Sequence, residues 1–94
     1  MEKSFQGNCP KTGQSVYIND SAVIIGDVEI DDDSSIWPTA VIRGDVNRIR
    51  IGRRTSIQDG TVIHVHHKAS EEAPGHAAII GDDVTVGHLS LIHI

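Results

Sequence analysis

Three histidines have the types and spacing of metal ligands. The chain contains six histidines, of which His64 directly follows Ile63, His93 directly follows Ile92, and His88 lies between them. Three neutral imidazoles with an open fourth position are typical of a catalytic zinc site. The competing interpretation is that each histidine simply faces solvent. The choice between the two depends on the elements that position these residues.

Aliphatic residues recur every six positions through most of the chain. They form three phases, namely Ile24, Ile30, Ile36 and Ile42, then Ile51, Ile57 and Ile63, then Ile80, Val86 and Ile92. An α-helix repeats every 3.6 residues and a simple strand every 2 residues, so neither explains a period of six. The period is typical of hexapeptide β-helices, in which three sides make one triangular coil. We predict an all-β fold that resembles the left-handed parallel β-helix, with about three coils; an irregular β-sandwich is the less favoured alternative.

The repeats indicate one domain portion rather than several domains. Residues 1–94 are predicted to form a single unit with hexads over residues 22–94. The period is interrupted by a short bulge at 47–50 and by a loop insertion at 65–79. The longer insertion is polar and contains glycine and proline, as surface loops do. Loops that leave a regular solenoid are good candidates for shaping a site.

Counting sides of the predicted prism places the histidines. His64 and His93 fall at the same position of successive coils, so they should project outward on adjoining strands, about 4.8 Å apart. That spacing lets two imidazoles share one ion. His88 falls on the preceding side, near a corner, and could hardly meet the other two within one subunit. A neighbouring subunit could supply it, which would make the site intermolecular.

Composition excludes several classes of partner. The net charge of −5 argues against nucleic-acid binding, which requires clustered basic residues. No apolar stretch is long enough for a signal peptide core or a membrane span. The single cysteine, Cys9, cannot form an internal disulfide. We therefore expect a cytoplasmic protein without nucleic-acid or membrane partners.

Two longer motifs point to a known family. The segment SIWPTAVIRGDVNRIRIGRRTSIQDGTVIHVHHKAS, followed by IIGDDVTVGH, resembles the gamma-class carbonic anhydrases. These are trimeric left-handed β-helix proteins, and the chain is more similar to their small bacterial members than to the founding archaeal type. The resemblance covers about residues 16–88. It implies a homotrimer acting on carbon dioxide and bicarbonate.

The resemblance also implies roles for individual residues. Three histidines match the family's metal ligands, and four further residues match those beside the metal and its bicarbonate pocket. The metal ligands are His64, His88 and His93, with His88 coming from the neighbouring subunit; the other four are Arg43, Asp45, Gln58 and Asp59.

The chemistry implied by the resemblance is hydration of carbon dioxide. The metal is zinc, or iron or cobalt, and lowers the pKa of bound water from about 15.7 to near 7, so that hydroxide attacks carbon dioxide. Gln58 would orient the hydroxide or the substrate. Arg43 would be a fixed positive charge held by Asp45 and Asp59, although Arg43 and Asp45 are equally well explained as trimer-interface residues.

The chain departs from the founding enzyme at two acidic positions. Val46 stands where that enzyme has a glutamate, and His67 stands where it has its second acidic residue. These differences keep two other functions open. One is a hexapeptide-repeat acyltransferase that uses a histidine as general base. The other is a non-catalytic trimeric scaffold that binds metal.

The last residues raise a separate expectation. Members of the family continue with more coils and a C-terminal helix, so the chain is expected to be a C-terminally truncated member that is inactive as a fragment. Residues 89–94, LSLIHI, are interpreted either as native sequence or as foreign sequence joined to a shortened gene.

Overall fold

The structure is a computed structural model that describes residues 1–65, 78–89 and 91–93. Every regular element in this part of the chain is a β-strand. The strands are β1 (Glu2–Lys3), β2 (Lys11–Thr12), β3 (Tyr17–Ile18), β4 (Val23–Ile30), β5 (Ser35–Ile36), β6 (Val41–Ile51), β7 (Ser56–Ile57), β8 (Val62–His64), β9 (Ala78–Ile80), β10 (Thr85–Val86) and β11 (Leu91–His93). No helix long and apolar enough to cross a membrane occurs among the described residues.

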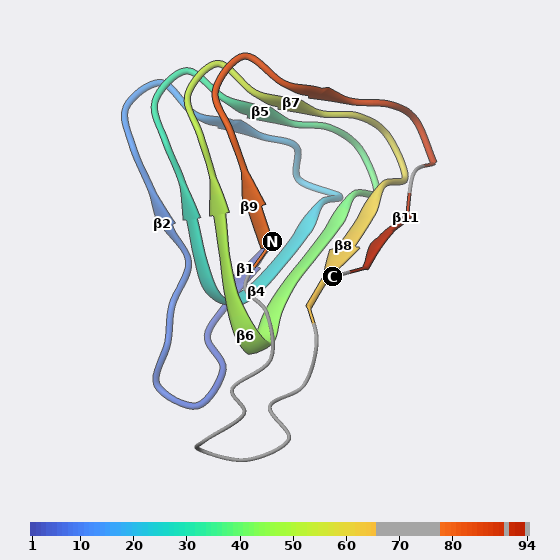
Figure 1. Cartoon of the computed structure of the whole chain (residues 1–94). Coiled ribbons are helices and arrows are strands. Elements are labelled where there is room, and N and C mark those ends of the chain that lie inside the picture. Colours follow the sequence, from blue (N-terminus) through green and yellow to red (C-terminus); the bar gives the residue numbers. More distant parts are fainter. Residues whose placement is uncertain (66–77, 90, 94) are drawn as a thin grey trace.

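Parallel pairing stacks these strands into the three faces of a prism (Figure 1). The first face contains β1, the first half of β4, the first half of β6, β8 and β11. The second face contains β2, the second halves of β4 and β6, and β9. The third face contains β3, β5, β7 and β10. The predicted fold class, a left-handed parallel β-helix of hexapeptide repeats, is confirmed.

The six-residue period corresponds to the interior of the prism. Ile24, Ile42, Ile63 and Ile92 are in register on the first face, Ile30, Ile51 and Ile80 on the second, and Ile36, Ile57 and Val86 on the third. The members with described side chains are fully or almost fully buried, apart from the half-buried Ile80. Each coil therefore buries its isoleucines against those of its neighbours, which is why a single coil has no stable core of its own.

The stack extends further toward the N-terminus than the hexads indicated. β2 pairs with β4 through Thr12 and Ile30, and β3 pairs with β5 through Ile18 and Ile36. Residues 11–18 therefore add two sides of a preceding coil. Their aliphatic content is too low to continue the isoleucine period, so the sequence pattern does not mark them.

The two insertions enter at the same corner, between the first and second faces. Gly26 pairs with Gly44 and Val28 pairs with Ile49, so residues 45–48 of the second coil stand opposite the single residue Asp27, and Arg50 is already back in register. In the third coil the chain leaves the first face after Val65 and returns at β9, where Ala78 is buried. Residues 78–79 of the predicted loop insertion thus belong to a strand; residues 66–77 lie outside the described part.

Candidate metal site

His64 and His93 occupy adjoining strands of the first face. β8 and β11 are parallel, and their register pairs His64 with His93. On the other side of β8, β6 pairs Arg43 with His64. Neighbouring strands lie about 4.8 Å apart. The register thus brings Arg43, His64 and His93 into one column of the first face, as side counting predicted for the two histidines; their role as metal ligands stays a prediction.

His88 lies at the corner between the third and first faces, which we call the histidine corner (residues 37–39, 58–60 and 87–89). Its side chain is 68% exposed, and its Nδ1 is 3.9 Å from Oδ1 of Asp59. The backbone is fixed more tightly than the side chains, because the N–H of Leu89 donates to the carbonyl of Asp59 at 2.8 Å. Within the described part of the chain, no three His, Cys, Asp or Glu side chains are grouped to hold a metal ion.

Gln58 reaches the histidine corner from the third face. It directly follows the buried Ile57, so its side chain points outward, and its Nε2 donates a hydrogen bond to Oγ of Ser56. Its backbone N–H donates to the carbonyl of Val86 at 3.0 Å. Gln58, Asp59 and His88 are therefore neighbours at one corner, which the sequence predicted for the first two only through the family resemblance.

Arg43 and Asp45 form an ion pair beside this column. Nη2 of Arg43 is 3.2 Å from Oδ2 of Asp45, and Nε is 3.3 Å from the same oxygen. The carboxylate is mostly buried, with 17% of the side chain exposed, and its Oδ1 accepts no hydrogen bond in the described structure. Asp59 makes no ion pair with Arg43 among the described residues. A buried acceptor without a donor is unfavourable by about 1–3 kcal/mol, so an external donor would be stabilising here.

The glycine between these two residues has a steric reason. A Cβ on Gly44 would lie 2.6 Å from the backbone oxygen of Asp27, on the preceding coil. The two coils can approach this closely only because that position has no side chain. In the sequence Arg43-Gly44-Asp45, the glycine therefore allows close packing of two coils, and the residues on either side of it form the ion pair.

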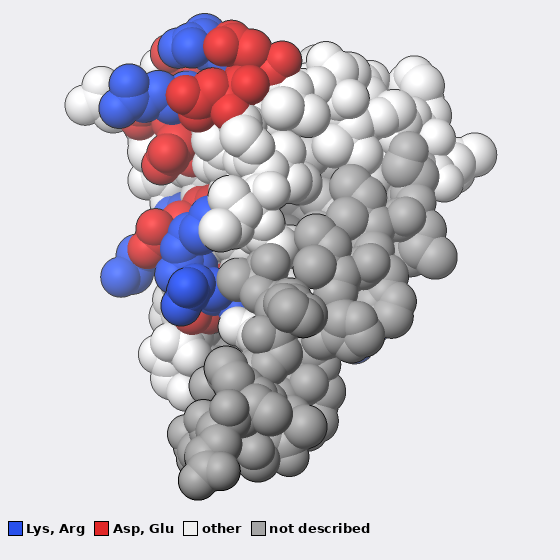
Figure 2. All heavy atoms as spheres, viewed as in Figure 1, with Lys and Arg blue, Asp and Glu red and all other residues white. Residues whose placement is uncertain are grey.

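Charged side chains gather elsewhere, chiefly at the corner between the second and third faces (Figure 2). We call this the acid–base corner; it consists of residues 31–33, 53–54 and 82–83. Nε and Nη2 of Arg54 donate to the two carboxylate oxygens of Asp83 at 2.7 and 2.9 Å. The hydrogen bond from Arg54 lowers the pKa of Asp83, and the same interaction raises the pKa of Arg54. Carboxylate oxygens of Asp32 and Asp82 accept backbone N–H groups of neighbouring coils.

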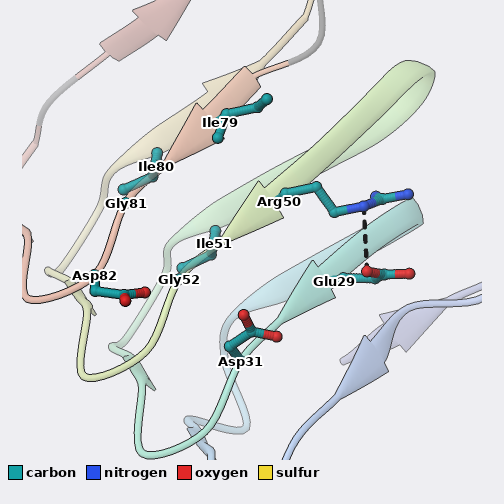
Figure 3. Close-up of a pocket in the computed structure, with 9 residues that line it drawn as sticks. All are labelled: Glu29, Asp31, Arg50, Ile51, Gly52, Ile79, Ile80, Gly81 and Asp82. Carbon is teal, nitrogen blue, oxygen red and sulfur yellow. Dashed lines mark ion pairs between the residues drawn. The ribbon is translucent and has the colours of Figure 1, made fainter.

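A shallow pocket on the second face contains none of the predicted site residues (Figure 3). Its lining combines the exposed Ile79 with acidic side chains and Arg50. Arg50 is already paired, because its Nε is 3.2 Å from Glu29 and its Nη1 is 3.0 Å from Asp27. The cation of this lining is therefore already paired, and the three carboxylates of Glu29, Asp31 and Asp82 leave the lining with a net negative charge.

Comparison with known proteins finds the same six-residue repeat that the fold shows. A family described as bacterial transferase hexapeptide (six repeats) matches residues 10–44. Protein YrdA of Escherichia coli is 55% identical over 84 residues, which are 89% of this chain and 46% of that protein. The mitochondrial gamma carbonic anhydrase 2 of Arabidopsis thaliana is 46% identical over 84 residues, 89% of this chain and 30% of that protein.

The chain is a homologue of gamma carbonic anhydrases and contains the hexapeptide repeat. A solved structure of a putative acetyltransferase from Bacillus cereus superposes with a TM-score of 0.88 at 39% identity, covering 99% of this chain and 50% of that one. The chain thus spans about half the length, or less, of the relatives it matches. Carbonic anhydrases within the family support a metal-dependent, lyase-type activity for its members.

The structure adds residues to the site that the sequence did not single out. Oγ of Ser56 accepts a hydrogen bond from Nε2 of Gln58 on the third face, and Nε1 of Trp37 donates to the same Oγ at 3.1 Å. The available signal was their hexad position, since Trp37 follows Ile36 as Gln58 follows Ile57. Residues at equivalent positions of adjoining coils are neighbours on the surface.

Proposed function

We propose that the protein is a carbonic anhydrase-like metalloenzyme that hydrates carbon dioxide to bicarbonate at the interface of a homotrimer. The observation that carries this proposal is the register that pairs His64 with His93 and Arg43 with His64. A divalent metal, with zinc as the first choice and iron or cobalt as alternatives, would be held by His64 and His93 of one subunit and by His88 of the next.

The donor set suits such an ion. Imidazole nitrogens are good ligands for zinc, iron and cobalt, and adjoining parallel strands place two of them within reach of one ion. When bound, the metal supplies Lewis acidity that lets an attached water ionise near neutral pH. The corner position of His88, with its largely exposed side chain, supports the participation of a second subunit.

The remaining residues would orient and stabilise the reacting groups. Gln58, next to Asp59 and close to His88, would hydrogen-bond to the attacking water or to bicarbonate. Arg43 lies one strand from His64, and its positive charge would favour the anionic product over neutral carbon dioxide. Asp45 would keep the guanidinium in place through the ion pair at 3.2 Å.

Two features of the first face support the homotrimer. Val23, Val41 and Val62 are in register and half-buried on its outer side, which leaves apolar surface beside Arg43. The unpaired Oδ1 of Asp45 would gain a donor from a neighbouring subunit.

The single, exposed Cys9 is consistent with a reducing cytoplasmic setting.

The experiment is metal analysis with a stopped-flow hydration assay on the protein as its gene encodes it. We expect close to one metal ion per subunit and measurable hydration, with both lost in His64→Ala. His76→Ala removes a histidine outside the predicted ligand set and serves as the matched control. A metal-free wild-type protein would overturn the proposal.

An acyltransferase remains the second candidate, because the superposed Bacillus cereus protein is described as a putative acetyltransferase. In that case a histidine would act as general base toward an acceptor hydroxyl or amine. A panel of acyl-CoA donors distinguishes the two functions. Acyl transfer that survives metal removal would favour this candidate over the hydratase.

A further inference from the structure

The short insertion at the corner between the first and second faces carries one partner of an ion pair. Residues 45–48 stand opposite the single residue Asp27 of the preceding coil and form a bulge in β6. Bulges of this kind re-aim side chains beside functional sites. The first residue of the bulge is Asp45, whose Oδ2 is 3.2 Å from Nη2 of Arg43. The place of this ion pair therefore depends on how the bulge leaves the stack of coils and how it returns.

The bulge begins in close contact with the backbone of Asp27. A Cβ on Gly44 would lie 2.6 Å from the carbonyl oxygen of Asp27 and 2.9 Å from Cγ2 of Val28. No side chain fits into that space, so the two coils meet through their backbones. This contact holds the beginning of the bulge by packing alone.

The bulge ends at a charged clamp that is built on the same Asp27. Nη1 of Arg50 donates to three oxygens, namely the carbonyl of Ile49 at 2.9 Å, Oδ1 of Asp27 at 3.0 Å and the carbonyl of Asp27 at 3.3 Å. Both side chains are partly shielded from water, which strengthens such charge-assisted hydrogen bonds. One guanidinium nitrogen thus connects the returning strand to the residue that the bulge spans.

Glu29 binds the same guanidinium from another side. Its Oε2 is 3.2 Å from Nε of Arg50, and the two residues are cross-strand partners on β4 and β6 (Figure 3). Among the described residues, this contact does not involve the corner. Exposed pairs of this type contribute little to stability. Glu29 therefore offers a matched control, because its replacement removes one ion pair of Arg50 and leaves the contacts with Asp27 and Ile49.

We propose that Arg50 is a positioning residue that fastens the 45–48 bulge to Asp27 and thereby sets the ion pair between Asp45 and Arg43. The catalytic consequence rests on the proposed hydratase function, in which Arg43 lies beside the metal. Arg50 itself lies on the second face, away from the first face and from the histidine corner. It would therefore act through Asp45 and not on the substrate.

An arginine suits this task better than a lysine. The guanidinium presents several N–H donors in a rigid planar fork, so it can serve Asp27, Ile49 and Glu29 at the same time. The ammonium group of a lysine is a single point on a flexible stem. Arg50→Lys keeps the positive charge and should lose the combined contact, which makes it a mild change that separates geometry from charge.

The first test compares Arg50→Lys with Glu29→Gln in the protein as its gene encodes it. We expect kcat/KM for hydration to fall about tenfold in Arg50→Lys, the lower end of the range for loss of an outer-shell partner. Glu29→Gln should stay within about twofold of wild type. Metal content should equal that of the wild type in both variants, since neither change touches a predicted ligand. Equal kcat/KM in Arg50→Lys and Glu29→Gln would overturn the positioning role.

A second test asks whether Arg50 acts through Asp45. Residues that act as one unit give non-additive effects when they are changed together. Adding Arg50→Lys to Asp45→Asn should lower kcat/KM by less than about twofold beyond the single Asp45→Asn change. A further loss of about tenfold in that background would show that Arg50 acts independently, and would overturn the proposal.

A third measurement is independent of activity. Nε of Arg43 donates to Oδ2 of Asp45 at 3.3 Å, so its N–H resonance reports on this pair. The resonance, assigned by its loss in Arg43→Lys, should shift and exchange faster with solvent in Arg50→Lys and stay unchanged in Glu29→Gln. A lower urea midpoint of Arg50→Lys with an unchanged Arg43 resonance would overturn the proposal, because the role would then be structural only.

The two proposals fail in different ways. A wild-type protein without hydration would overturn the proposed function and leave the Arg43 resonance to decide whether Arg50 sets the ion pair. An active wild-type enzyme whose Arg43 resonance does not respond to Arg50→Lys would overturn only the positioning role.

Discussion

The acid–base corner and the histidine corner share one backbone design but differ in what their side chains do. Each contains positive-φ residues at equivalent places, Arg54 (51°) and Asp83 (58°) at the first and Gly60 (70°) and Leu89 (56°) at the second. At the acid–base corner, Arg54 and Asp83 satisfy each other through two short hydrogen bonds.

At the histidine corner the imidazole of His88 and the carboxylate of Asp59 are too far apart for a hydrogen bond. His88 and Asp59 approach only to 3.9 Å, and their side chains are 68% and 51% exposed. The backbone geometry therefore does not distinguish a structural corner from a functional one. The difference lies in whether the side chains use up each other's hydrogen-bonding capacity, and four predictions test this comparison.

The largest expected difference is in activity. His88→Ala should abolish metal binding and lower carbon dioxide hydration at least about a hundredfold, because a metal ligand carries several kcal/mol of transition-state stabilisation. Arg54→Ala, at the acid–base corner, should stay within about twofold of wild type. Metal content and stopped-flow rates provide the measurement, and similar losses in both variants would remove the distinction between the corners.

The interior of both corners should respond in the same direction. Oγ1 of Thr55 donates to the carbonyl of Gly81, and Oγ1 of Thr61 to that of Gly87, both at 2.8 Å, and both threonines are buried. Thr55→Val and Thr61→Val should each lower the free energy of unfolding by about 1–3 kcal/mol, because each change removes the hydroxyl of a buried threonine that joins two coils.

The matched control for these two changes is Thr85→Val, which makes the same replacement at an exposed position. It should change the free energy of unfolding by less than about 0.5 kcal/mol. Urea unfolding measures all three variants. A markedly smaller effect at Thr61 than at Thr55 would show that the two corners differ inside as well as outside.

A smaller effect is expected from Gly60→Ala at the histidine corner. The positive φ is unfavourable for alanine by about 1–2 kcal/mol, and a Cβ there would meet Cδ2 of Leu89 at 2.5 Å. Gly7→Ala isolates the backbone contribution, because Gly7 also has positive φ but no atom within 4 Å of a Cβ. Equal losses of unfolding free energy in the two variants would mean that Leu89 moves aside freely.

The smallest effect is the pH dependence of the acid–base corner. The pKa of Asp83 is lowered from its ordinary value of 3.8, chiefly by the hydrogen bond from Arg54, so its contribution to stability is present above that value and is lost as the pH falls below it. Urea midpoints of wild type and Asp83→Asn should differ slightly at about pH 7 and converge as the pH falls progressively below 3.8, and added salt should reduce the difference. A difference that persists at low pH would contradict this account.

The period of six was sufficient to predict the interior, because burial depends on residue type and spacing alone. Ile24, Ile42 and Ile63 stack as expected. The histidine register followed from the same count. The chain before residue 22 was not predicted, because Thr12 and Ile18 join the stack through backbone pairing with little aliphatic repetition.

The residues around Gln58 could also not be predicted from the sequence. Trp37 and Ser56 are nineteen residues apart, and only the stacking of coils brings the indole to the hydroxyl. The sequence likewise did not single out Ile49, which replaces a hexad position because residues 45–48 shift the register. The sequence pattern thus predicted which side chains point into the prism better than it predicted which side chains contact each other across adjoining coils.

The insertion between β8 and β9 has a consequence for how readily such a fold acquires new loops. Equivalent corner contacts are 18 residues apart in a pair of coils without an insertion, as from Gln14 to Asp32, and 29 residues apart where the long insertion intervenes, as from Arg53 to Asp82. Loop-closure entropy rises by only about 0.6 kcal/mol for each doubling of length, so this lengthening opposes folding by about 0.4 kcal/mol. A coil can therefore be elongated at a corner with almost no thermodynamic penalty, which leaves the outside of the prism free to diversify while its interior stays constant.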